Sequence, residues 1–497
     1  MSALRRREFL HRALCATAGS AAFGSLMGKM ELAQAAVPRS LLGAGSNYKA
    51  LVCLYLYGGN DCFNMVIPRD AGYSTYAQMR TSLAIPQAQL LPLNPTTAPQ
   101  GGGQFGLHPR MVGAQQMFNA GQAAIIANVG PLVRPVNKQI YQMGGTPLPA
   151  QLFSHSDQSV LWQTPRADTA ARMGWGGRLA DIFAASNLNQ VLSMNVSLDG
   201  DNVFQAGVQV APYFMSAQGV EQIDLIQTGA ANCADGGNGW NRRRCLSFQA
   251  LQNHTHAHPF ERAYVNKTQR TIATSAQVGA AINLFPENNV LFRPFWDAFG
   301  LTWNPSNLPE LPRLAQQLLM IARVMRSRSQ LQMSRQLFFA AIGGFDTHDH
   351  QLADQQDLLR DLSQSVKAFY DVLANPVMNL SNDVTTFTSS EFGRTLTNNG
   401  DGTDHGWGGH HMVFGGAVNG SAIYGRMPSL LPSASNPDDA GWGQIIPQLS
   451  VDQYAATLAK WYGLSDTDRA EIFPNLSFMT GNMLSIQGPN LGFMQPG

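Results

Sequence analysis

The sequence predicts an α/β fold built on a largely parallel sheet. Short runs of apolar, β-branched and aromatic residues recur along the chain, as expected for strands buried on both faces. Longer segments with apolar residues at helical spacing separate these runs. Such alternation of strands and helices indicates βαβ units with right-handed crossovers.

The predicted strands run into clusters of glycine, polar and ionisable residues. They cover residues 51–57, 123–129, 190–196, 336–342, 384–388 and 411–414. Because ligands bind outside the carboxyl ends of strands in open α/β sheets, these clusters mark the expected functional edge.

Helices are predicted over 311–325, 352–373 and 451–462, the last ending near Gly463. Residues 212–307 are rich in Gly, Asn and Pro and predict a loop-rich insertion or cap in the main domain.

The composition restricts the class of partner. The chain has 497 residues, with 33 Lys+Arg, 32 Asp+Glu and a formal net charge of +1. A net charge so close to zero indicates neither a basic surface for binding nucleic acid nor a polybasic arm for binding anionic lipid. No apolar run approaches the roughly 18 residues of a spanning helix, so we expect no membrane span in the mature chain.

The first 36 residues predict a twin-arginine signal peptide. Arg5, Arg6 and Arg7 precede an Ala- and Gly-rich stretch, and residues 33–35 form an A-x-A cleavage pattern. The alternative is an amphipathic N-terminal helix of the mature protein. With a signal peptide, domain 37–497 is expected to be periplasmic or secreted.

An oxidising compartment would allow disulfides. Cys233 and Cys245 flank a polar loop and are the best candidates for a bridge. For Cys53 and Cys62 the sequence leaves two alternatives open, a bridge or two buried thiols.

Three clusters of carboxylate and imidazole groups follow the predicted strands. The candidate metal ligands are Asp61, Asp346, His348, His350, Glu391, Asp404, His405 and His411. Such mixed ligands suit zinc, manganese or iron, and together they could hold one or two divalent metals. The alternatives are a turn or helix cap at Asp61, a polar helix start at 346–350 and a glycine-loop filler at 404–405.

Ser154 and Ser156 are the candidate nucleophiles. Both lie where a helix is expected to start after the second strand, so the helix dipole would help to hold an anion. An ordinary N-cap is the alternative. Arg394 could clamp an anionic substrate oxygen or form a structural ion pair.

Four motifs, at 58–61, 344–348, 391–395 and 402–406, resemble those of a large family of exported bacterial proteins, domain-of-unknown-function family fifteen-oh-one. That family is similar to the alkaline phosphatase and sulfatase superfamily. The resemblance implies a three-layer α/β/α sandwich with a one-metal or two-metal site, ligated by Asp61, an Asp346–His350 pair and an Asp404–His405 pair. It also implies a Ser nucleophile, for which Ser154 or Ser156 is the nearest match.

The chain departs from the superfamily pattern at one strand end. Glu391 and Phe392 stand where the superfamily has its Asp-His pair, and Asp404–His405 follows on a loop. From the ligand set and the resemblance, the leading hypothesis is a metal-dependent hydrolase of a phosphate, sulfate or related anionic ester. The competing hypothesis is a catalytically inactive, metal-stabilised binding or scaffold protein with an unknown secreted partner.

Overall fold

The computed structural model describes residues 48–164, 166, 172–189, 192–220, 239–479 and 488–496. The predicted signal peptide and Cys233 lie outside these residues, so both remain predictions. In the part of the chain that the structure describes, no helix is long and apolar enough to cross a membrane.

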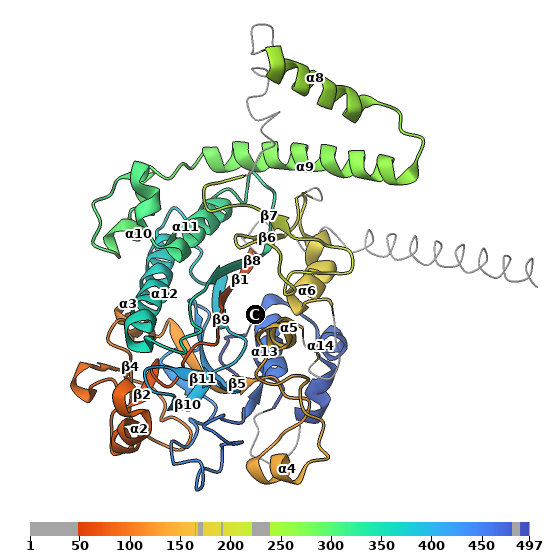
Figure 1. The fold of residues 1–497 in the computed structure, drawn as a ribbon. Coiled ribbons are helices and arrows are strands. Elements are labelled where there is room, and N and C mark those ends of the chain that lie inside the picture. Colours follow the sequence, from red (N-terminus) through yellow and green to blue (C-terminus); the bar gives the residue numbers. More distant parts are fainter. Residues whose placement is uncertain are drawn as a thin grey trace, which may run out of the picture. The chain divides into compact units, whose positions relative to one another are not determined.

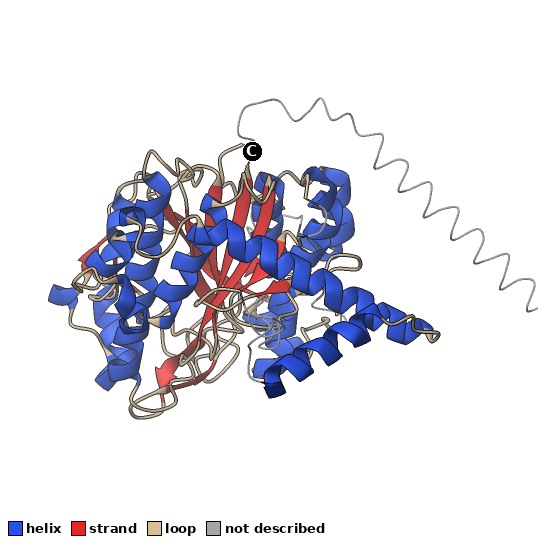
Figure 2. Cartoon of the chain, turned by 90° about the horizontal axis from the view of Figure 1, so that it is seen from above, coloured by secondary structure: helices blue, strands red, loops and turns tan. Residues whose placement is uncertain are grey.

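A nine-stranded sheet runs through the described residues (Figures 1 and 2). Its order is β13 (Ala422–Tyr424), β5 (Ala123–Gly130), β12 (Gly409–Phe414), β9 (Val384–Ser389), β1 (Lys49–Leu56), β8 (Arg335–Ile342), β6 (Asn195–Ser197) and β7 (Tyr213–Phe214), with β14 (Leu449–Ser450) also pairing with β5. Only β12 runs antiparallel to its described neighbours, β5 and β9. The prediction of an α/β fold with a mostly parallel sheet is confirmed.

Helices lie on both faces of this sheet (Figure 1). One side carries α3 (Val112–Asn119), α11 (Arg313–Arg326) and α12 (Gln351–Ala374), and the other carries α5 (His155–Gln163), α6 (Trp175–Phe183), α13 (Val451–Tyr462) and α14 (Asp466–Ile472). Because both faces are covered, β1 is buried from Ala50 to Leu56. This burial explains why the central strands are almost continuously apolar.

Local signals fix the helix ends. The α13 helix begins with a capping box, in which Ser450 and Gln453 satisfy each other's backbone N–H groups, and Gly463 follows its last turn with φ 123°. On α12, Leu359, Leu362 and Val366 are buried at the spacing expected for one face.

Smaller elements surround the sheet. The strands are β2 (Val66–Pro68), β3 (Leu91–Pro92) and β4 (Phe105–Leu107), which form a three-stranded sheet, and β10 (Arg394–Asn398) and β11 (Thr403–His405), which form a hairpin. The other helices are α2 (Gly72–Arg80), α4 (Lys138–Met143), α8 (Gly239–Asn253), α9 (Pro259–Asn283) and α10 (Pro294–Asp297). Short 3₁₀ helices cover Thr81–Leu83, Gln87–Gln89, Ala184–Ser186, Val290–Phe292, Pro305–Glu310 and Pro474–Met479.

The structure corrects two predictions of secondary structure. Of the strand expected at 190–196, residues 190 and 191 are not described, residues 192–194 lie outside a strand, and β6 begins at Asn195. Leu192 N donates a hydrogen bond to the Asn189 side chain instead of to a neighbouring strand. The insertion expected to be loop-rich contains the long helices α8 and α9. The prediction of loops rests on the glycines and prolines of this segment, but Val278 and Ile282 are buried at helical spacing on α9.

Cys53 and Cys62 are free, buried thiols, so of the two alternatives the bridge is wrong. Cys245 is buried on α8. Since Cys233 is not described, the predicted Cys233–Cys245 bridge is not tested.

Candidate metal centre

Side chains from distant parts of the sequence meet where β1, β5, β8 and β9 end. These four strands point the same way, since β12 is antiparallel to both β5 and β9 and the other two pair in parallel with their neighbours. Asp346 follows β8, His155 opens α5 after β5, and His405 ends β11. The carboxyl edge of the sheet is therefore the functional edge that the sequence led us to expect.

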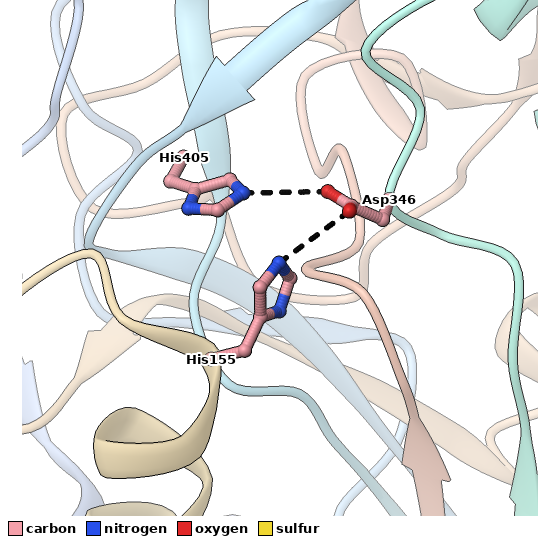
Figure 3. A group of neighbouring side chains, drawn as sticks. All are labelled: His155, Asp346 and His405. Carbon is pink, nitrogen blue, oxygen red and sulfur yellow. Dashed lines mark ion pairs between the residues drawn. The ribbon is translucent and has the colours of Figure 1, made fainter.

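Asp346 lies between two imidazoles (Figure 3). Its Oδ2 is 3.5 Å from His155 Nε2, and its Oδ1 is 3.4 Å from His405 Nε2. Ligand atoms bound to one zinc ion at about 2.1 Å in a tetrahedral site lie about 3.4 Å apart. One oxygen or nitrogen from each of these three residues lies within 4.8 Å of the others. The three residues therefore have the spacing of a metal-binding group.

His348 supplies a fourth donor. Its Nε2 lies 3.0 Å from His405 Nε2 and 3.1 Å from Asp346 Oδ1. Three imidazole Nε2 atoms thus face one carboxylate.

The opposite ring nitrogen of each histidine faces an acceptor. His405 Nδ1 lies 2.7 Å from Phe153 O, and His348 Nδ1 lies 3.2 Å from Asp404 Oδ1. His155 Nδ1 lies 3.6 Å from Glu391 Oε1. Histidines that ligate metals usually donate Nδ1–H to such a group, which orients the ring and leaves the Nε2 lone pair for the metal.

Glu391 is held by the glycine turn after β1. It is buried, and its carboxylate accepts hydrogen bonds from Gly58 N at 3.0 Å and Gly59 N at 3.1 Å. Gly58 has φ +116°, and a Cβ there would lie 2.2 Å from Asp346 N. Only glycine fits where this turn meets Asp346. Glu391, through its hydrogen bond and charge, raises the pKa of His155.

Arg394 holds Asp346 in place through an ion pair. The guanidinium is wholly buried and donates from Nη1 to Asp346 Oδ1 at 2.6 Å and to Gly58 O at 3.1 Å. Burial opposes ionisation of Asp346, but Arg394 outweighs it and lowers the pKa of the carboxyl group. Of the two roles considered for Arg394, the geometry matches the structural ion pair.

Asp61 and His350 lie outside this group of side chains. Asp61 is buried in an ion pair with Arg80 and also accepts a hydrogen bond from the Gln351 side chain. His350 is exposed, has φ 48° and precedes α12, with Nδ1 3.9 Å from Asp349 Oδ1. The spacing of Asp346 and His350 suggested one helical face, but α12 begins only after His350.

The remaining candidates have other partners. His411 is buried in the core with its ring centroid 4.5 Å from that of Trp162, and burial lowers its pKa to about 3. Ser154 precedes α5, and its Oγ donates to Asp157 Oδ2 at 2.6 Å. Ser156 Oγ lies 3.3 Å from Ser154 Oγ, so the two hydroxyls form one cluster.

His155 is the member of the site that sequence reasoning missed. It stands between the two serines and opens α5. Its position at the start of a helix that follows β5 in the chain was a signal that the sequence offered, but only the hydroxyls beside it were assigned a role.

The family model described as "Protein of unknown function (DUF1501)" matches residues 48–437. The chain belongs to this family. The matched region includes His155, Asp346, His348 and His405. No curated protein matches the chain.

Proposed function

We propose that the protein is a metal-dependent hydrolase of an anionic ester, phosphate or sulfate in class, with one divalent metal. The observation that carries the proposal is the convergence of three Nε2 atoms on Asp346 while each Nδ1 faces an acceptor. Imidazole and carboxylate ligands together suit zinc, manganese or iron.

The donor set fits such a metal. His348 Nε2 and His405 Nε2 lie 3.0 Å apart. With Nδ1–H directed to an acceptor in each ring, both Nε2 atoms present lone pairs to each other and to a carboxylate. A bound cation relieves this repulsion.

One metal is favoured over two. Asp61 is neutralised by Arg80, and His411 packs against Trp162. Among the described residues, a single group of three or more possible ligands converges.

Exposure of the cluster favours a reactive site over a closed structural one. The side chains of Asp346, His348 and His155 are 46%, 44% and 37% exposed. A divalent metal at this position would polarise an ester oxygen and lower the pKa of bound water. In this proposal Ser154 is the nucleophile. Its hydrogen bond to Asp157 Oδ2, which could take its proton, and its position at the N-terminus of α5 support this role.

The wider proposal keeps the relation to the alkaline phosphatase and sulfatase superfamily and export by the twin-arginine route. A mostly parallel sheet with helices on both faces and ionisable groups at its carboxyl edge supports the relation. The arginines at 5–7 support export.

A metal-stabilised binding protein is the second candidate. Burial of Arg394 favours it, because this guanidinium has no surface free to hold a substrate anion.

Turnover of phosphate and sulfate monoesters by the metal-loaded full chain tests the proposal. We expect Asp346→Asn to lower kcat/KM by at least about 100-fold, because it weakens both the metal site and its link to Arg394. His350→Ala is the matched control and should keep full activity. Unchanged turnover in Asp346→Asn contradicts the proposal. A tightly bound metal without turnover on any ester supports the binding protein instead.

A further inference from the structure

The C-terminal part of α9 attaches the α8–α9 hairpin, residues 239–283, to the rest of the domain. Val278, Ala281 and Ile282 of α9 are buried, and Ser327 Oγ donates to Ala281 O at 3.0 Å. Gln269 Nε2 donates to Gln252 O at 2.9 Å and ties the two helices together. Figure 1 shows both helices beyond the β6–β7 end of the sheet.

Large apolar side chains of this hairpin are exposed. Phe260 is 81% exposed, Tyr264 71%, Trp240 64% and Leu251 60%. Phe260, Tyr264 and Lys267 are spaced i, i+4 and i+7, so they share one face of α9. Exposed apolar groups gathered in this way mark a contact surface.

The hairpin is also strongly basic. Its only acidic residue is Glu261, and its cationic residues are Arg242, Arg243, Arg244, Arg262, Lys267 and Arg270. The net charge of +1 for the whole chain conceals this local excess. The absence of a polybasic arm, inferred from the chain average, therefore does not hold for this segment.

A cleft of about 690 Å³ lies between α9 and the chain around β6 and β7. Lys267 and Arg270 line it from α9, and Ser193 and Gln209 lie among the lining residues contributed by the rest of the chain. Among the described residues that line the cleft there is no Asp or Glu. The cleft therefore offers two cations and polar groups to an anion.

We propose that the hairpin docks on a membrane surface containing anionic phospholipids. Aromatic side chains partition to the membrane interface, and cations next to them are attracted to anionic headgroups. The cleft beneath α9 receives a headgroup phosphate. Ser193 and Met194, which line the cleft, directly precede β6, whereas the metal centre lies at the carboxyl ends of the strands. Because β6 runs parallel to β8, this surface and the metal centre lie at opposite ends of the strands.

Co-sedimentation of the full chain with phosphatidylcholine vesicles, with and without phosphatidylglycerol, tests the proposal. We expect binding only to the vesicles that contain phosphatidylglycerol, and we expect it to weaken as salt rises. Lys267→Gln with Arg270→Gln should weaken binding by about 30-fold, since each cation near such a surface contributes about five- to sixfold. Phe260→Ser with Tyr264→Ser should weaken it by at least about tenfold.

Matched controls lie elsewhere on the surface. Trp442→Ser and Arg293→Gln change side chains that are 86% and 57% exposed, and both variants should bind within about twofold of the parent chain. Equal binding to both vesicle types overturns the proposal, as does full binding by both hairpin variants. Binding to neither vesicle also overturns it and points to an acidic protein surface as the partner. Unchanged melting temperatures confirm that the variants fold.

Discussion

His155 approaches Asp346 from α5, and its two ring nitrogens face different carboxylates, Asp346 and Glu391. At the scale of this residue, we predict that His155→Ala lowers zinc affinity by at least about tenfold, because it removes a ligand. Competition with a chromophoric chelator measures the change. His350→Ala serves as the control and should leave the zinc affinity unchanged. If His350→Ala lowers the affinity and His155→Ala does not, the ligands are Asp346 and His350 as the sequence predicted.

Glu391 acts on the site through His155. Glu391→Gln keeps the size of the side chain and an acceptor for Gly58 N, but removes the charge facing His155 Nδ1. We predict a loss of metal affinity of about 10- to 100-fold.

Glu391→Gln should also change the pKa of His155 in the metal-free protein. Because Glu391 raises the pKa of His155, the pair stabilises the fold below the unfolded value of about 6.5, and this stabilisation is lost as pH rises through the folded value. An NMR titration should show a lower pKa for His155 in Glu391→Gln. An unaltered pKa would mean that the carboxylate does not act on this ring.

At the scale of elements, the Asp61–Arg80 ion pair joins the turn after β1 to the end of α2. Both side chains are fully buried. We predict that Asp61→Asn costs about 3 kcal/mol of unfolding free energy, because it leaves a buried guanidinium without its counter-charge. Urea unfolding measures this cost, and bound metal should not change. If Asp61→Asn loses its metal but keeps its unfolding free energy, Asp61 is a metal ligand.

Strand β12 carries two buried histidines, His410 and His411, and burial lowers the pKa of each to about 3. Since the unfolded chain takes up these protons below about pH 6.5, stability should fall as pH drops from there towards 3. The expected loss between pH 7 and pH 5 is about 2 kcal/mol for each residue. Urea unfolding of His411→Gln should show a smaller loss than the parent chain, and an equal loss would contradict the assignment.

At the scale of the whole molecule, the sequence predicted the central elements closely. Apolar runs and helical stripes are local signals, so β5, α12 and α13 lie within two residues of their predicted bounds. Convergence of the groups after β8 and β9 also follows from strand direction alone. Side-chain direction does not, because it depends on partners distant in sequence. Asp61 forms an ion pair with Arg80 instead of joining the metal-binding group, and Glu391 faces the ring of His155. The spacing of residues in the sequence reveals neither contact.

The metal content of the full chain, purified without a histidine tag, tests the central claim most directly. Plasma mass spectrometry should find about one equivalent of zinc, manganese or iron, the same amount in Asp61→Asn, and little in a variant with both His155→Ala and Asp346→Asn. Chelation should lower the melting temperature of the parent chain. No bound metal, together with a melting temperature that chelation leaves unchanged, would contradict the account.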